Sequence, residues 1–114
     1  MTVSLNKEQI KELLPHREPM LLIDELLNIK KLFSATAVVN VKKDSFYVQG
    51  HFPGQPVMPG VFIVEAFGQA AAALTANGLD KSTYENKLVF LHQSVHQSKA
   101  LGLCEAINFL FLYG

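Results

Sequence analysis

The N-terminal part of the chain changes from a helical to a strand-like spacing of apolar positions. Asn6 and Gln9 have the form of a capping box, and the apolar residues after them recur at helical intervals. Those apolar positions are Ile10, Leu13 and Leu14. Pro15 follows and predicts the end of the helix, because proline cannot donate a backbone hydrogen bond. Residues 20–30 are mostly apolar and predict a buried strand, although their leucines would also suit a helix.

Residues 32–42 alternate between apolar and polar side chains, which is typical of a half-buried strand. The apolar set is Phe33, Ala35, Ala37, Val39 and Val41, and the polar set is Ser34, Thr36 and Asn40. The stretch from there to Met58 is rich in glycine and proline and predicts a long loop, and loops of this length are often functional. After a polar linker, residues 87–95 predict another strand.

The longest apolar run predicts a helix over residues 59–77. Pro59 falls in its first turn, where a missing N–H is harmless, and the Asn-Gly pair at 77–78 predicts a left-handed stop. About 18 residues at 1.5 Å each would span about 27 Å, enough to cross a small domain. Glu65 and Gln69 interrupt the apolar run, so a buried core helix fits it better than a membrane span. Because apolar residues surround this helix, the rest of the fold is expected to wrap around it.

The order of helix, strand, strand, long helix and strand places the chain in the α+β class. We expect a single domain over residues 1–114, in which an antiparallel sheet wraps around one long central helix. Residues 107–113 are too apolar to remain in water alone, so they are expected to pack on the helix or to pair with a sheet edge.

Composition narrows the classes of function. The chain is 49% apolar and 18% charged, which is typical of a globular protein. Ten basic and ten acidic residues cancel, so neither a nucleic acid nor a membrane surface is expected as a partner. Cys104 is the single cysteine, which excludes an internal disulfide and fits a reducing cytoplasm. The N-terminus lacks the apolar core of a signal sequence.

One histidine, one acid and one amide stand out as candidate chemistry. His51 lies in the Gly/Pro-rich loop, while Glu65 and Gln69 are four residues apart and share a helix face, where Gln69 would orient Glu65. An acid among apolar neighbours is desolvated, which favours its protonated form and suits a general acid, and an imidazole is the natural base. The N–H groups of Gly60 and Val61, at the positive end of the helix, could receive a carbonyl oxygen that gains charge.

These residues also have a plainer interpretation, with His51 as an ordinary loop histidine and Glu65 as a buried acid satisfied by a neighbour. Taken together, with a Pro-Gly helix start between them, they favour proton transfer next to a carbonyl group.

Other reactive side chains give weaker signals. Cys104 has no basic neighbour and is interpreted as an inert buried thiol. His92 and His96 are four residues apart, but no cluster of carboxylates or cysteines accompanies them, so no metal is expected. His16 is interpreted as a structural loop residue. The sequence has no glycine-rich nucleotide motif and no GxSxG motif.

Three stretches of the chain carry a specific resemblance. They are residues 14–24 (Leu-Pro-His-Arg-Glu-Pro-Met-Leu-Leu-Ile-Asp), 50–60 (Gly-His-Phe-Pro-Gly-Gln-Pro-Val-Met-Pro-Gly) and 64–69 (Val-Glu-Ala-Phe-Gly-Gln). Together they closely resemble the β-hydroxyacyl-acyl carrier protein dehydratases of bacterial fatty acid synthesis, a hot-dog-fold family. The resemblance covers residues 8–90, and glutamate at position 65 favours the general dehydratase over a similar, isomerising relative that carries aspartate there.

The resemblance implies a hydro-lyase that removes water from (3R)-3-hydroxyacyl-acyl carrier protein and yields the trans-2-enoyl product in type II fatty acid synthesis. His51 would be the catalytic histidine and Glu65 the catalytic acid, with the two coming from opposite subunits of a dimer. The N–H group of Gly60 or Val61 would hold the thioester carbonyl. A cytoplasmic homodimer or a trimer of dimers, with acyl carrier protein as a partner and with no cofactor or metal, is also implied.

The tail over residues 91–114 departs from the family, as an internal deletion or a shifted reading frame would produce. Several strands and a basic strand that would face the carrier protein are expected to be missing, which predicts a weaker dimer and lower stability. The alternative function is therefore a catalytically impaired fragment that only binds acyl chains or pairs with an intact subunit. A hot-dog thioesterase or enoyl hydratase fits less well, because thioesterases of this fold generally lack the Gly-His-Phe-Pro-Gly loop.

Overall fold

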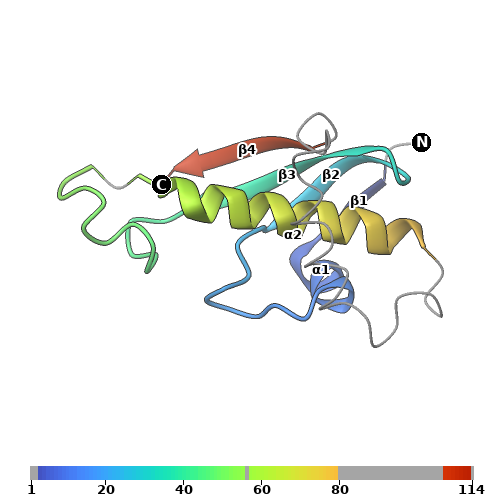
Figure 1. The fold of residues 1–114 in the computed structure, drawn as a ribbon, viewed down its shortest axis with the longest axis horizontal. Coiled ribbons are helices and arrows are strands. Elements are labelled where there is room, and N and C mark those ends of the chain that lie inside the picture. The colour runs from blue at the N-terminus through green and yellow to red at the C-terminus, as the bar shows by residue number, and fades with distance from the viewer. Residues whose placement is uncertain (1–2, 56, 80–106, 114) are drawn as a thin grey trace.

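The computed structural model describes residues 3–55, 57–79 and 107–113, which form one sheet and two helices (Figure 1). The elements are β1 (Val3–Leu5), α1 (Lys7–Leu13), β2 (Glu25–Lys30), β3 (Ser34–Val41), α2 (Gly60–Gly78) and β4 (Ile107–Tyr113). The sheet has the order β1-β2-β3-β4, and α2 lies along one of its faces with α1 beside it (Figure 1). The predicted α+β class is confirmed. The strand predicted over 87–95 lies outside the described residues.

The sheet is mixed rather than wholly antiparallel. β2 pairs with β3 in the antiparallel sense that the sequence predicts, and β1, which the sequence does not predict, also pairs antiparallel with β2. β4 instead runs parallel to β3, from the pair Ala35 and Ile107 to the pair Val41 and Tyr113. A parallel neighbour requires a long crossover connection, and the chain between β3 and β4, which includes α2, supplies one. The antiparallel prediction is wrong for this strand pair, whereas the expected pairing of residues 107–113 with a sheet edge is confirmed.

The side chains of β3 alternate largely as their sequence predicts. Its buried apolar residues include Ala35, Ala37, Val39 and Val41, all of which belong to the hydrophobic core. Asn40 is exposed, while Val38 is buried against the alternation. Phe33, which the alternation assigns to the buried face, is 71% exposed. β3 begins only at Ser34, so Phe33 belongs to the preceding turn and not to the strand.

The apolar stretch before β2 is a buried loop and not a strand. The sequence predicts a strand from residue 20, but β2 begins only at Glu25. Its buried side chains are Leu21, Leu22 and Ile23. The backbone N–H of Leu22 donates to the side-chain oxygen of Gln69 on α2, at 2.9 Å. A side-chain amide thus takes the place of a neighbouring strand, which lets an irregular segment lie in the core.

The short helix α1 has the boundaries and the cap that its sequence predicts. The side chain of Asn6 accepts from the backbone N–H of Gln9, and the Gln9 side chain accepts from the backbone N–H of Asn6, both at 2.9 Å. The helix ends at Leu13, and Leu14 is extended because the residue before Pro15 is disfavoured in the helical region. β1 was not predicted, since three residues are too few to show an alternation.

Helix α2 is enclosed along its second half and open at its start. Residues 70–74 are buried in succession, so every face of the helix is covered there, as its composition predicts. Near its start, Val61 is 70% exposed and Val64 is 39% exposed. Pro59 is the N-cap rather than a residue of the first turn, and its carbonyl accepts from the N–H of Phe62 at 3.0 Å.

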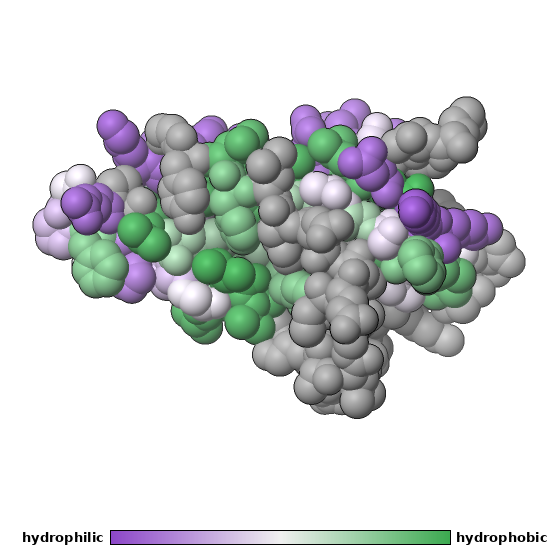
Figure 2. Space-filling model, turned by 90° about the horizontal axis from the view of Figure 1, so that it is seen from above, coloured by the Kyte–Doolittle hydropathy of each residue, from purple (hydrophilic) through white to green (hydrophobic). Residues whose placement is uncertain are grey.

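Several large apolar side chains remain at the surface of the described residues. They are Met20, Leu32, Phe33, Phe46, Phe52, Val57, Val61, Val64 and Leu112. Seen from above, hydrophobic side chains gather over the middle of the molecule, and hydrophilic ones lie mainly toward its margins (Figure 2). Exposed apolar groups that lie together are characteristic of contact surfaces.

The C-terminal end of α2 lies in close contact with the turn between β2 and β3. Leu79 is extended, with φ −101°, and its N–H donates to Ala76 O at 3.2 Å. Among the described residues, positive φ angles occur only at Asn28, Leu32, Gly50 and Gly54, so the predicted left-handed stop at 77–78 is wrong. A Cβ atom at Gly78 would lie 2.5 Å from Cγ of Leu32, in the turn between β2 and β3. Gly78 therefore allows this turn to approach the helix closely.

We predict that Gly78→Ala lowers the free energy of unfolding by about 1–3 kcal/mol, because the added methyl group overlaps Leu32 and overpacks the contact. Denaturant unfolding measures the change. Gly60→Ala is the matched control, since nothing lies within 4 Å of a Cβ atom built there. Leu32→Ala should restore stability in the Gly78→Ala background. Equal stability of Gly78→Ala and the wild type would contradict this reading of the contact.

Candidate active site

The ring of His51 is oriented by its own loop. The N–H of His51 donates to Val48 O at 2.9 Å, and its carbonyl accepts from the N–H of Val57 at 2.8 Å. The ring atom Nδ1 lies 3.1 Å from the carbonyl oxygen of Val57. Because a carbonyl oxygen can only accept, Nδ1 carries the hydrogen in this contact, and Nε2 of the neutral ring holds the lone pair. His51 therefore has the tautomer of a base that acts through Nε2.

The loop around His51 uses two glycines that other residues could not replace without strain. Gly50 has φ +81° and Gly54 has φ +78°, both in the left-handed region. The His51 ring is partly buried and stacks on Phe52, with 4.3 Å between the ring centroids. Phe52 is itself 56% exposed, so this aromatic pair lies at the surface of the single chain.

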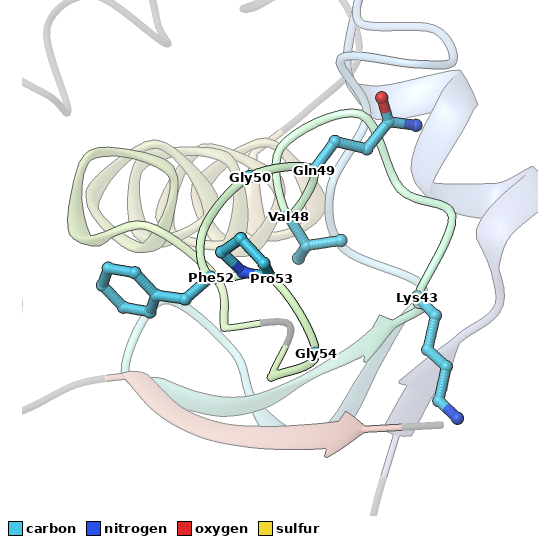
Figure 3. Close-up of a pocket in the computed structure, with 7 residues that line it drawn as sticks. All are labelled: Lys43, Val48, Gln49, Gly50, Phe52, Pro53 and Gly54. Atoms are coloured by element: carbon cyan, nitrogen blue, oxygen red, sulfur yellow. The ribbon is translucent and has the colours of Figure 1, made fainter.

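The same loop borders a cavity of about 360 Å³ (Figure 3). The lining residues are Lys43, Val48, Gln49, Gly50, Phe52, Pro53 and Gly54. Phe52 and Lys43 project away from its centre (Figure 3). Neither His51 nor Glu65 lines this cavity, so it is not a space in which the two candidate groups meet.

The start of α2 offers backbone donors to the space outside the helix. Within the part of the chain that the structure describes, no acceptor is paired with the N–H of Gly60 or of Val61, which is expected for the first turn of a helix. Gly60 is exposed, and the space where its Cβ would lie is open to 4 Å. The helix dipole adds partial positive charge at this end, so the two donors can receive a carbonyl oxygen.

Glu65 and Gln69 are joined by a hydrogen bond one turn apart on α2. The Gln69 side-chain nitrogen Nε2 donates to Glu65 Oε2 at 2.9 Å. The expected proximity of this acid and this amide is therefore present in the structure. The Glu65 side chain is 22% exposed, so the enclosure among apolar neighbours that the sequence predicts is only partial.

Gln69 itself is fully buried and hydrogen-bonded at both ends of its amide. Its oxygen accepts from the N–H of Leu22 at 2.9 Å, and its nitrogen donates to Met20 O at 2.8 Å as well as to Glu65. Among the described residues it is the single fully buried polar side chain. The amide thus fixes the loop before β2 against the helix, and it fixes Glu65 relative to both.

The structure adds His16 to the surroundings of Glu65. His16 Nε2 lies 3.6 Å from Glu65 Oε2, and the His16 side chain is only 15% exposed. The sequence interpretation treated His16 as a structural loop residue, because nothing local links it to a position 49 residues away. The sequence feature that could have identified His16 as a site residue is its position in the stretch 14–24, one of the three that carry the family resemblance.

Within one chain, the predicted site residues are held by two different sets of contacts. Glu65, Gln69 and the added His16 lie together, where α2 meets the loop before β2. His51 is tied through Val57 to the segment that leads into α2. The cluster around Glu65 and the loop of His51 are thus held by different parts of the fold.

Some of the residues that the sequence analysis singled out lie outside the part of the chain that the structure describes. Cys104, His92 and His96 lie outside the described residues. In the part of the chain that the structure describes, no three His, Cys, Asp or Glu side chains are grouped so that they could hold a metal ion. No helix among the described residues is long and apolar enough to cross a membrane.

Comparison with known proteins places the chain in the FabA-like family. A family model described as a FabA-like domain matches residues 14–102. The chain is similar to the 3-hydroxyacyl-(acyl-carrier-protein) dehydratase FabZ of Variovorax paradoxus, with 44% identity over 89 residues, or 78% of this chain and 59% of the relative. It is also similar to the FabZ of Pelotomaculum thermopropionicum, with 50% identity over 68 residues, or 60% of this chain and 49% of the relative. The chain therefore spans about half the length of these curated relatives.

We predict that Gln69→Leu lowers the free energy of unfolding by about 1–3 kcal/mol, because it leaves the buried N–H of Leu22 without an acceptor while preserving side-chain size. Denaturant unfolding again provides the measurement. Gln49→Leu, at an exposed glutamine, is the matched control and should change stability by less than about 0.5 kcal/mol. Equal effects of the two substitutions would show that the buried amide contributes no more to the free energy of unfolding than an exposed one.

Proposed function

Because the chain belongs to the FabA-like family, we propose that it removes water from (3R)-3-hydroxyacyl thioesters of acyl carrier protein and forms the trans-2-enoyl thioesters of fatty acid synthesis. Its FabZ relatives are named as 3-hydroxyacyl-(acyl-carrier-protein) dehydratases, which supports this reaction. The observation that carries the proposal is the presence of two differently prepared groups: a histidine whose Nε2 holds the lone pair, and a glutamate held by a buried amide.

In the proposed reaction, Nε2 of His51 takes the proton from C2 of the acyl chain. The electrons of the broken C2–H bond form the double bond between C2 and C3, and the C3–O bond breaks. Glu65 gives its proton to the departing hydroxyl group, which leaves as water. While C2 loses its proton, the thioester carbonyl oxygen gains charge, and the N–H groups of Gly60 and Val61 stabilise it. No metal or cofactor takes part in this scheme.

The proposal includes a homodimer, or a larger assembly built from dimers, in which His51 of one subunit and Glu65 of the other form one active site. The separate attachment of these two groups within one chain supports this arrangement. Exposed apolar residues near His51 and the start of α2, namely Phe52, Val57, Val61 and Val64, offer surface that a second copy could cover. We also propose acyl carrier protein as the partner and the cytoplasm as the compartment, in line with the reducing environment that a lone cysteine fits.

A second candidate function is a fragment that binds acyl chains or pairs with an intact subunit without turning substrate over. The observation in its favour is length, since the chain spans 59% of one curated relative and 49% of another. A thioesterase or an enoyl hydratase of the same fold has no such observation in its favour. Binding without turnover would distinguish the fragment from the enzyme.

We predict that His51→Ala and Glu65→Ala each lower kcat by at least about 10²-fold in a dehydratase assay that follows the enoyl thioester, because each removes one of the two proton-transfer groups. Gln69→Ala should cost less, since its role is to orient Glu65. Glu25→Gln, at an exposed acid on β2, is the control and should keep wild-type turnover. Near-wild-type turnover in either alanine variant would remove that residue from the mechanism. If the wild type binds acyl chains but is inactive, the second candidate function, a fragment that binds without turnover, is favoured.

We predict that Gly60→Ala lowers kcat/KM by about tenfold or more, because its methyl group would occupy the open space through which a carbonyl oxygen reaches the helix donors. Thermal stability should stay equal or rise slightly, since the added Cβ meets nothing and reduces the freedom of the unfolded chain. Kinetics and melting of the same sample check both statements. Unchanged kcat/KM would mean that the substrate carbonyl binds elsewhere.

A further inference from the structure

His16 is a side chain that the proposed reaction does not use, yet it contacts the candidate acid. Its Nε2 lies 3.6 Å from Glu65 Oε2, the same oxygen that accepts from Gln69 Nε2 at 2.9 Å. Two nitrogen groups, one from the loop before β2 and one from α2, thus approach a single carboxyl oxygen. The two partners of the ion pair are 15% and 22% exposed, so solvent screens this contact less than it would an open surface pair.

The loop that carries His16 is anchored at several points, so the fold sets the position of the ring. Arg17 donates through Nη1 to Leu14 O at 2.9 Å and through Nη2 to Lys11 O at 3.2 Å, which ties the loop to α1. Glu18 pairs with Lys11 at 3.2 Å. The backbone N–H of Glu18, followed by Lys11, lowers the pKa of the Glu18 carboxyl, and this keeps the pair charged.

We propose that His16 is a positioning residue that acts through Glu65, an inference that rests on the proposed dehydration. When neighbouring groups donate hydrogen bonds to Oε2, the proton of the Glu65 carboxylic acid is more stable on the other oxygen, Oε1. Gln69 supplies one such group from within α2, and the His16 ring nitrogen makes a second contact with the same oxygen, at 3.6 Å, from outside the helix, so rotation of the carboxyl group is restrained from two directions. An acid that is fixed in this way delivers its proton from one orientation, which is what proton transfer to a leaving hydroxyl requires.

Three variants test the proposal in the dehydratase assay. His16→Leu removes the ring nitrogen and should lower kcat by about tenfold with KM nearly unchanged, because a lost interaction with a charged or protonated acid acts on the chemical step. His16→Gln places an amide nitrogen near the position of Nε2 and should recover most of the wild-type kcat. Glu18→Gln loosens the anchor of the same loop without touching Glu65, so it should lower kcat by no more than about twofold, much less than His16→Leu does. If His16→Leu acted only by loosening the loop, His16→Leu and Glu18→Gln would lower kcat by similar factors, which would contradict the proposal.

A second readout does not need turnover. In NMR titrations of the full chain, the midpoint of the His16 ring should move to lower pH in Glu65→Gln, because a nearby carboxylate favours the imidazolium. His16→Gln identifies the resonance, and Arg17, whose Nη1 donates to His16 O at 2.6 Å, remains in both samples. An unmoved midpoint, or an active wild type whose kcat His16→Leu leaves intact, would overturn the positioning role. An inactive wild type would instead contradict the proposed function itself, while the midpoint would still report whether the contact exists.

Discussion

The arrangement of the candidate site depends on one buried amide. Gln69 lies inside the core with no exposed surface, and its two ends hold three groups: the N–H of Leu22, the carbonyl of Met20 and the carboxyl of Glu65. A buried amide without these partners would be costly, so the helix, the loop and the acid form as one unit. This constraint explains how an irregular apolar segment can lie in the core, and why His16, on the same loop, comes within reach of Glu65.

The two chemical groups of the proposed reaction are supported in different ways. Glu65 is held through side chains, by Gln69 and by the anchored loop of His16. His51 is held through backbone groups, by the carbonyl oxygens of Val48 and Val57, in a turn that requires two glycines at positive φ. In the proposed reaction, the first arrangement would orient the proton donor and the second would fix the tautomer of the base, so each half of the proposed site is prepared within one chain. Only the meeting of the two halves requires a second copy in the proposed assembly.

Local signals in the sequence predicted most of the fold, and what they missed was long-range. The capping box of α1, the alternation in β3 and the apolar length of α2 are properties of neighbouring residues, and each was confirmed within a few positions. The loop before β2 has the composition of a strand, because burial selects apolar residues whatever the backbone does. The parallel direction of β4 comes from the crossover that precedes it, and no pattern within β4 encodes it. In the site, the proximity of Glu65 and Gln69 followed from helical spacing, whereas His16 reaches Glu65 only through the tertiary fold.

In the proposed assembly, two prepared halves, one centred on His51 and one on Glu65, form a site between two copies of the chain. The most direct measurement mixes the two inactive variants, His51→Ala and Glu65→Ala, after joint unfolding and refolding. Random pairing in a twofold dimer would give mixed dimers with one intact site each, so the mixture should recover about a quarter of the wild-type turnover. Turnover that stays at the level of the separate variants, in a sample shown to contain mixed dimers, would contradict a site shared between subunits.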